Sequence, residues 1–226
     1  MKGSNVRTIA IDGACRRNGQ PDCISAGACF VVNKFNDLVQ TKVLTNIEEN
    51  STSQRGELLG LILALEHFRS SPTDTAIITD SEYLFNTVTK GWLSRWRAND
   101  WKTAEGADVK NQDLWNVALD IIESSPFEVV AMYHIKGHLL SVGAKKSEKL
   151  FLEDNSGYSL YTYVHSEKTI QPEKLEHAVE LCEANNGFIF SEDVWQMFAA
   201  MNVVADTAAN LRLTAYETAK WAQMLQ

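Results

Sequence analysis

The strongest constraint on the fold comes from one stretch of the sequence, residues 52–68. Its apolar residues recur every three or four positions, and further leucines widen the stripe, which predicts a helix covered on most sides. Thr52 and Ser53 offer oxygens to the first free N–H groups of that helix. Glu57 lies beside the stripe, where a carboxylate is costly unless it is paired or bound to metal. Taken alone, Glu57 is more simply explained as an acid that complements the helix dipole.

Length and composition indicate one globular domain with an insertion, or a domain and a half. The chain has 226 residues, of which 45% are hydrophobic. It contains no run of about 18 apolar residues and no apolar core of a signal peptide near Met1, so we expect no membrane span and a cytoplasmic location. Its four cysteines form no CxxC pair, which indicates free thiols in a reducing compartment.

The formal net charge of −8 argues mildly against a nucleic-acid partner. The charge is unevenly spread, however, because acidic residues outnumber basic ones two to one in residues 141–200. Some of the remaining acids are candidates for a metal site. Net charge therefore leaves the choice of partner open.

The rest of the chain predicts an α/β sheet domain. Residues 7–15, 24–32 and 38–45 have strand patterns, and Asn18-Gly19 is a hairpin signal, so these segments predict three antiparallel strands. A short apolar strand then ends at Asp80 and runs into a helix, which implies a parallel addition to the sheet. The later elements that we expect are a helix at 113–123, a strand at 127–133, a helix at 172–186 and one long helix from Ser191 to the C-terminus.

Four acids stand where such a fold forms its sites. Asp12 and Asp80 lie at or near strand ends, and Glu57 and Asp206 lie on predicted helices. Carboxylates gathered together repel one another unless a divalent cation neutralises them. Oxygen-only ligands suit Mg²⁺ or Mn²⁺ rather than Zn²⁺. Two such ions would clamp the attacking water and the leaving oxygen of a phosphodiester.

These acids stand in an ordered set of motifs that resembles type 1 ribonuclease H (ribonuclease HI). The resemblance covers residues 6–140 and about 201–215. The matching motifs are Asp12-Gly13-Ala14, Thr52-Ser53-Gln54-Arg55-Gly56-Glu57, Thr79-Asp80-Ser81-Glu82-Tyr83, Trp101-Lys102-Thr103 with Val109-Lys110-Asn111, Lys136-Gly137-His138, and Asn202-Val203-Val204-Ala205-Asp206.

The resemblance implies a ribonuclease H-like α/β fold, with a mixed five-stranded sheet flanked by helices and an inserted, partly helical segment. Residues 1–140 would form the core, with a handle region at about 90–111. Residues 141–200 would be the insertion, and residues 201–226 a helix that completes the core.

The resemblance also implies an endonuclease that hydrolyses the RNA strand of RNA–DNA hybrids with two metal ions and leaves 5′-phosphate and 3′-hydroxyl ends. Asp12, Glu57, Asp80 and Asp206 would bind two Mg²⁺ ions, with Mn²⁺ as an alternative. His138 would lie on a mobile loop and assist deprotonation of water or release of product. We expect a monomer whose substrate partner is the hybrid.

Substrate-binding residues follow from the same resemblance. Thr52 and Asn111 correspond to positions that hold a DNA-strand phosphate, and Ser53 and Gln54 to positions that reach the minor groove of the hybrid. Basic residues outnumber acidic ones only weakly in the handle region, where Trp92 and Lys102 are the candidate contacts. Trp92 and Trp96 are four residues apart, so packing of a helix onto the domain is an equal alternative for at least one of them.

The chain departs from the family pattern in three places. Ser53 stands where Asn is usual, Asn50 where some members have an Arg, and Val203 where Glu is more usual. The insertion at 141–200 replaces a short loop; a lid, an added hybrid-binding surface, a partner-docking element and a passive elaboration all remain open. Two other functions stay as alternatives: a non-catalytic hybrid-binding module, and a nuclease of the same fold that acts on another structured nucleic acid.

Overall fold

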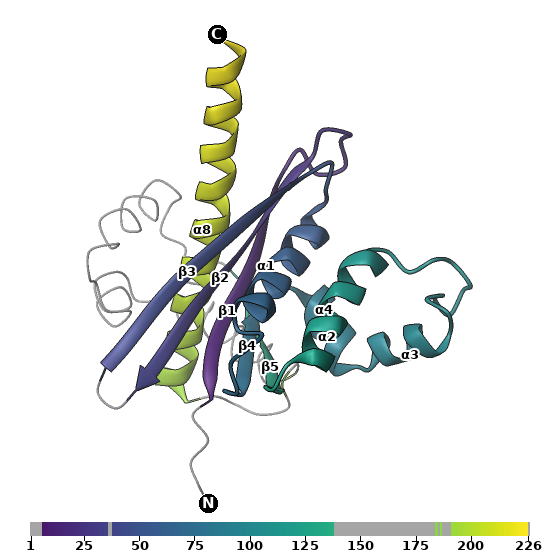
Figure 1. Ribbon diagram of the computed structural model, residues 1–226, viewed down its shortest axis with the longest axis vertical. Helices are drawn as coiled ribbons and strands as arrows, with labels where there is room; N and C mark the ends of the chain where they lie inside the picture. Colours follow the sequence, from purple (N-terminus) through teal and green to yellow (C-terminus); the bar gives the residue numbers. More distant parts are fainter. Residues whose placement is uncertain (1–5, 36–37, 138–183, 185, 187–190, 226) are drawn as a thin grey trace, which may run out of the picture.

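The structure is a computed structural model that describes residues 6–35, 38–137, 184, 186 and 191–225. Figure 1 shows its strands and helices in chain order. The strands are β1 (Arg7–Arg16), β2 (Ile24–Phe35), β3 (Leu38–Glu49), β4 (Thr75–Thr79) and β5 (Val129–His134). The helices are α1 (Ser53–His67), α2 (Glu82–Thr89), α3 (Trp92–Ala98), α4 (Gln112–Ser124) and α8 (Glu192–Met224). None of the helices in these ranges is both long enough and apolar enough to cross a membrane.

The strands form one mixed sheet in the order β3-β2-β1-β4-β5. β1, β2 and β3 are antiparallel neighbours, whereas β4 runs parallel to β1 and β5 runs parallel to β4. The expected mixed five-stranded sheet is therefore confirmed. β1 lies at its centre, between the antiparallel and the parallel halves, and β4 ends beside the middle of β1.

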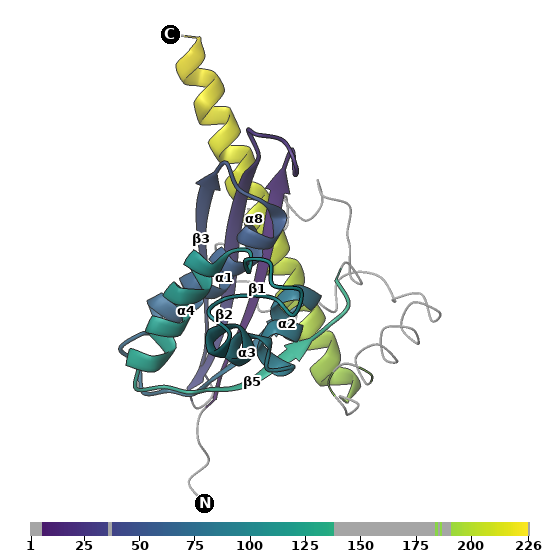
Figure 2. The same cartoon turned by 90° about the vertical axis from the view of Figure 1, so that its right-hand side faces the viewer.

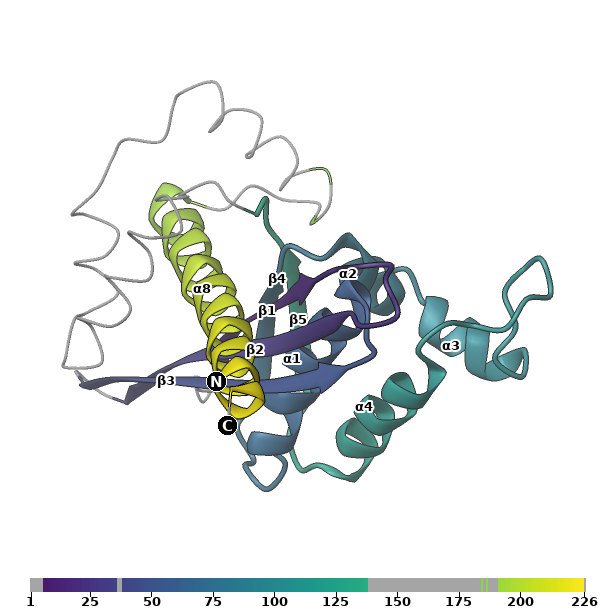
Figure 3. The same ribbon diagram turned by 90° about the horizontal axis from the view of Figure 1, so that it is seen from above.

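Helices cover both faces of the sheet. α1 packs on one face of the sheet, and α4 packs against α1. α8 crosses the other face along β1, β2 and β3 (Figure 3). One hydrophobic core lies under α1, α2 and α4, and two smaller clusters lie under α8. α8 has 33 residues and continues past the ends of the strands (Figure 2). The expected long C-terminal helix from Ser191 is confirmed.

Glycines allow α1 to approach the sheet closely. A Cβ atom added to Gly27 on β2 would lie 2.2 Å from the backbone nitrogen of Gly60 on α1. A Cβ atom added to Gly13 on β1 would lie 2.3 Å from the backbone nitrogen of Glu57. Since no side chain fits at these positions, the helix rests directly on the strands, and Glu57 is held against β1.

The beginning of α1 is fastened by an ion-pair cluster, the Arg55 anchor, which consists of Glu48, Arg55 and Asp113. Arg55 Nη2 lies 2.7 Å from Glu48 Oε1 at the end of β3 and 2.8 Å from Asp113 Oδ2 on α4. Hydrogen bonds from Arg55 lower the pKa of both Glu48 and Asp113 below their usual values. The anchor thus joins β3, α1 and α4 through charge-assisted hydrogen bonds.

The structure refines several predicted elements. β4 ends at Thr79, so Asp80 follows the strand instead of ending it. The handle region begins with α3, and Trp96 packs against the main core, as the packing alternative for Trp92 and Trp96 expected; Trp101 packs there as well. Cys15, Cys23 and Cys29 are free thiols. The helix predicted at 172–186 lies outside the described residues, apart from 184 and 186.

Candidate active site

Three carboxylates meet where β1, β4 and α1 come together. The last pair of residues in register between β1 and β4 is Ala10 and Ile78, so Asp12 and Asp80 both lie two residues further along. β4 has ended there, whereas β1 continues to Arg16, so Asp12 lies within its strand and not at the strand end that the sequence suggested. Glu57 reaches the same point from α1. Ligand oxygens of Asp12, Glu57 and Asp80 all lie within 4.8 Å of one another. We call these three residues the acid cluster.

The electrostatics of the acid cluster favour a bound cation. Asp12 is only 5% exposed, and burial together with the charges of Asp80, Glu57 and Asp206 raises its pKa well above the usual value. Burial and the charge of Asp80 likewise raise the pKa of Glu57. The Oε2 atom of Glu57 is buried and has no hydrogen-bond partner among the described residues. A set of carboxylate oxygens with one unsatisfied atom fits Mg²⁺ or Mn²⁺.

Two groups from different elements hold the carboxylate of Asp12. The backbone N–H of Gly13 donates to Oδ1 at 2.6 Å. Asn202 Nδ2 on α8 donates to Oδ2 at 3.2 Å, and Asn202 is itself 2% exposed. Asn202 was not among the predicted site residues, although its place in the Asn-x-x-Ala-Asp motif was a signal that could have found it.

Asp80 is enclosed by the segment that follows β5. A Cβ atom added to Gly137 would lie 2.0 Å from Asp80 Oδ2, so a larger residue at this position would displace the carboxylate. His134 Nε2 lies 3.2 Å from the backbone oxygen of Asp80, and since a carbonyl only accepts, the imidazole donates this bond. Burial lowers the pKa of His134. The position of Asp80 is therefore set from β5 as well as from β4.

The fourth predicted acid, Asp206, lies on α8 close enough for its charge to raise the pKa values of Asp12 and Glu57. It does not belong to the group of oxygens within 4.8 Å. Its Oδ1 atom accepts a hydrogen bond of 2.7 Å from Asn210 Nδ2. His138 lies outside the described residues, so its predicted role is not tested.

The candidate phosphate contact Thr52 and the candidate minor-groove residues Ser53 and Gln54 lie at the beginning of α1, at the same end as Glu57. Thr52 caps the helix, and its Oγ1 atom accepts a hydrogen bond of 3.3 Å from Arg55 N. Ser53 is held by Asn18 from the β1–β2 turn, because the Ser53 N–H donates to Asn18 Oδ1 and Asn18 Nδ2 donates to Ser53 Oγ, both at 3.2 Å. Gln54 is exposed. No sequence pattern pointed to the contact with Asn18.

The other candidate substrate contacts lie on the side of α3 and α4. Asn111 has a left-handed backbone (φ 59°) just before α4, and its Nδ2 donates to Tyr83 Oη at 3.4 Å. The ring of Trp92 lies 6.2 Å from that of Trp96. Lys102 Nζ forms an ion pair with Asp108. In the handle region, Trp92 is therefore partly buried against Trp96, and part of the positive charge is already compensated.

Comparisons with known proteins agree with this geometry. The family model described as RNase H matches residues 4–150, which include the whole acid cluster but not Asp206. The chain is 37% identical over 131 residues to a ribonuclease H of Chlorobium phaeobacteroides (strain BS1), which covers 58% of this chain and 82% of that protein. It is 37% identical over 140 residues to a ribonuclease H of Thermus thermophilus, which covers 61% of this chain and 78% of that one.

Solved structures show the same fold. The crystal structure of LC9-RNase H1, a type 1 RNase H with the type 2 active-site motif, superimposes with a TM-score of 0.52 at 18% identity and covers 80% of this chain and 85% of that one. The solution structure of the PFV RNase H domain gives a TM-score of 0.50 at 17% identity, over 81% of this chain and 95% of that one.

Proposed function

The chain belongs to the RNase H family and is a ribonuclease H enzyme, and we propose that it is an endonuclease that hydrolyses the RNA strand of RNA–DNA hybrids with two metal ions, leaving 5′-phosphate and 3′-hydroxyl ends. The observation that carries this proposal is the convergence of the Asp12, Glu57 and Asp80 oxygens within 4.8 Å. Such a concentration of negative charge beside the central strand β1 destabilises the folded protein, and a bound divalent ion would offset this repulsion.

The acid cluster and Asp206 would hold the ions, Mg²⁺ or Mn²⁺. When bound, such ions supply Lewis acidity and lower the pKa of water. The protein contributes a rigid cradle: Gly13 and Asn202 orient Asp12, and the close approach of α1 to β1 fixes Glu57. The Oε2 atom of Glu57 is buried and has no partner in the part of the chain that the structure describes, so it is the ligand atom most clearly left for a cation.

His138 follows directly on Gly137, which lies against Asp80. By the family resemblance, we assign to His138 the transfer of a proton from the attacking water or the release of product. An imidazole with an ordinary pKa near 6.5 exchanges protons readily at neutral pH.

Selectivity for the hybrid would come from the beginning of α1. Ser53 and Gln54 would read the minor groove, where 2′-hydroxyl groups distinguish RNA from DNA. The two hydrogen bonds between Asn18 and Ser53 support the assignment of Ser53, because one holds its backbone N–H and the other holds its hydroxyl group. Thr52 and Asn111 would contact a phosphate of the DNA strand.

The remaining candidates, Trp92 and Lys102, would contact the hybrid from the handle. Lys102 must leave Asp108, or contact Asp108 and a phosphate together, to bind the hybrid. Since the contact with a phosphate is electrostatic and the handle carries little excess positive charge, we expect hybrid binding to weaken with salt.

The test is cleavage of an end-labelled RNA–DNA hybrid with Mg²⁺, beside duplex RNA, duplex DNA and an EDTA control. Metal-dependent cutting confined to the RNA of the hybrid supports the proposal, and mapping of the product ends tests the end chemistry. Tight hybrid binding without cutting in Mg²⁺ or Mn²⁺ would overturn it in favour of a binding module. Equal cutting of duplex RNA would overturn the hybrid specificity.

A further inference from the structure

A series of hydrogen bonds connects Arg16, at the end of β1, to Asp206 on α8. Arg16 Nη1 donates to Asn210 Oδ1 at 3.0 Å. Asn210 Nδ2 in turn donates to Asp206 Oδ1 at 2.7 Å and to the backbone oxygen of Asp206 at 3.0 Å. Arg16 and Asn210 are 194 residues apart in sequence, so this contact exists only because α8 lies along β1.

The orientation of the Asn210 amide follows from its partners. A guanidinium group only donates hydrogen bonds, so the side of Asn210 that faces Arg16 must be its oxygen. The amide nitrogen therefore faces Asp206, where a carboxylate only accepts. The positive charge of Arg16 also polarises the amide and strengthens the hydrogen bond to the carboxylate.

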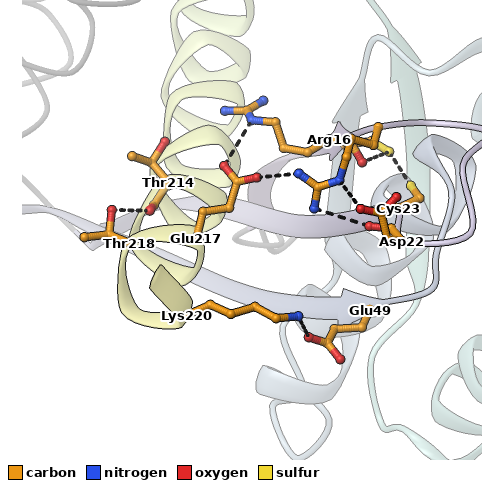
Figure 4. Close-up of polar contacts among 10 residues, drawn as sticks. Arg16, Asp22, Cys23, Glu49, Thr214, Glu217, Thr218 and Lys220 are labelled. Carbon is orange, nitrogen blue, oxygen red and sulfur yellow. Dashed lines mark hydrogen bonds and ion pairs between the residues drawn. The ribbon is translucent and has the colours of Figure 1, made fainter. Parts of the chain in front are cut away.

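Arg16 is itself held in place from α8. Its Nε atom lies 3.9 Å from Glu217 Oε2, as Figure 4 shows. Glu217 follows Asn210 by seven residues, two turns along the same face of the helix. Arg17 binds Glu217 too, with 3.0 Å between Nη1 and Oε1, but no contact joins Arg17 to Asn210 among those that the structure describes.

The same face of α8 contacts β1 on both sides of Asp206. Asn202, Asp206 and Asn210 are spaced by four residues, so their side chains form one row along the helix. Asn202 donates to Asp12, and Asn210 accepts from Arg16, four residues further along β1. Asp206 is thus bracketed by two amide contacts between the helix and the strand that carries Asp12.

We propose that Arg16 and Asn210 are positioning residues that hold the Asp206 carboxylate toward the acid cluster, ready to complete its ligand set. This proposal rests on the proposed function, because that function makes Asp206 a metal ligand. Asp206 needs such support because it comes from a helix on the opposite face of the sheet from Glu57 and stands outside the compact group of oxygens.

The test compares full-length variants Asn210→Leu and Arg16→Leu with a matched control, Arg17→Leu. The control removes a neighbouring arginine and its ion pair with Glu217 but leaves the contact with Asn210 in place. Mn²⁺ binding to the free protein is measured by calorimetric titration, and kcat and KM are measured on the hybrid with Mg²⁺.

We expect Asn210→Leu to weaken Mn²⁺ binding about tenfold, the usual loss when a group that orients a metal ligand is removed. Its kcat falls while its KM for the hybrid stays unchanged, because Asn210 is not among the candidate substrate contacts. Arg16→Leu shows the same pattern with a smaller loss, Asn210→Gln recovers part of the affinity because it keeps the amide, and Arg17→Leu resembles the parent.

Unchanged Mn²⁺ affinity and kcat in Asn210→Leu would overturn the proposal. A lower metal-free Tm without any change in affinity would also overturn it, since that result marks a purely structural contact. The proposed function fails separately: a parent protein that binds Mn²⁺ but does not cut the hybrid contradicts the nuclease assignment, whereas the calorimetric comparison of variants still decides the positioning role.

Discussion

Two groups of carboxylates from different elements meet the beginning of α1, one at Arg55 and the other at Glu57, and their environments are opposite. In the Arg55 anchor, Glu48 and Asp113 share one guanidinium group, which lowers the pKa of both. In the acid cluster, burial and mutual repulsion raise the pKa values of Asp12 and Glu57. Arg55 and Glu57 are separated only by Gly56, so the same helical turn serves both groups.

The difference separates carboxylates that stabilise the fold from carboxylates that cost stability. An arginine neutralises the charge of the anchor within the protein itself. The charge of the acid cluster is offset only in part by the N–H group of Gly13 and the amide of Asn202. Strongly perturbed groups of this second kind mark functional sites, because the missing compensation is left for a ligand.

The largest effect that would sharpen this comparison is loss of catalysis in Asp12→Asn. The substitution keeps the size of the side chain but removes the charge from the centre of the acid cluster, so we expect hybrid cleavage to fall on the order of 10³-fold or more. Single-turnover cleavage with Mg²⁺ measures the effect, with hybrid binding as the control for folding. A variant that cuts as fast as the parent would show that the metal assignment is wrong.

The next effect is the change in stability on adding metal. At a concentration a hundred times its Kd, a bound ion stabilises the folded state by about 2.7 kcal/mol, which corresponds to a rise in Tm of roughly 5–10 °C in a chain of this size. Glu57→Gln should show little of this rise and a higher metal-free Tm than the parent, because it removes one of the repelling charges. Thermal unfolding with and without Mn²⁺ makes the comparison, and an equal rise in both proteins would contradict it.

The fold and the acid cluster could be predicted because their signals are local. Alternating and three-to-four spacings located nearly every described strand and helix, and they placed Asp12 on β1, Glu57 in the early part of α1 and Asp80 next to β4. Once the strand order is known, the parallel register of β1 and β4 brings Asp12 and Asp80 together. Periodicity together with the ordered motifs therefore narrows the site to a few acids.

The supporting contacts could not be predicted in the same way. Arg16, Asn18 and Asn210 are ordinary surface residue types in the sequence, and their roles depend on how the β1–β2 turn meets α1 and α8. No spacing rule relates residues so far apart in the chain. Asn202 was an intermediate case, since its motif was recognised but its contact with Asp12 required the position of α8.

A smaller effect is expected when the Arg55 anchor is broken by Arg55→Leu. The variant leaves Glu48 and Asp113 without their shared cation, and we expect a loss of about 2 kcal/mol, as for hydrogen bonds to charged groups that are partly buried. Urea unfolding of the metal-free protein measures it. Arg69→Leu is the matched control, because its pair with Glu66 is exposed, and we expect a change below about 0.5 kcal/mol. Equal losses in the two variants would remove the distinction between the anchor and an ordinary surface pair.

The smallest effect is a pair of opposite pH dependences in the metal-free protein. Glu48 and Asp113 have lowered pKa values, so their contribution is complete above their usual values of 4.5 and 3.8 and is lost as the pH falls through the lowered ones. Asp12 and Glu57 have raised pKa values, so the folded state keeps protons that the unfolded state has released. Their contribution therefore falls as the pH rises above 3.8 and 4.5.

Denaturant unfolding between pH 3 and pH 8 separates the two groups by differences between variants. Arg55→Leu should lose most relative to the parent at neutral pH and least in acid, because the anchor is already protonated there. Glu57→Gln should gain most at neutral pH, and Mn²⁺ should abolish that gain, because a bound cation keeps the parent carboxylates ionised without repulsion. If both differences were independent of pH, the contrast between the anchor and the acid cluster would not lie in their charges, and the case for the cluster as a cation site would fail with it.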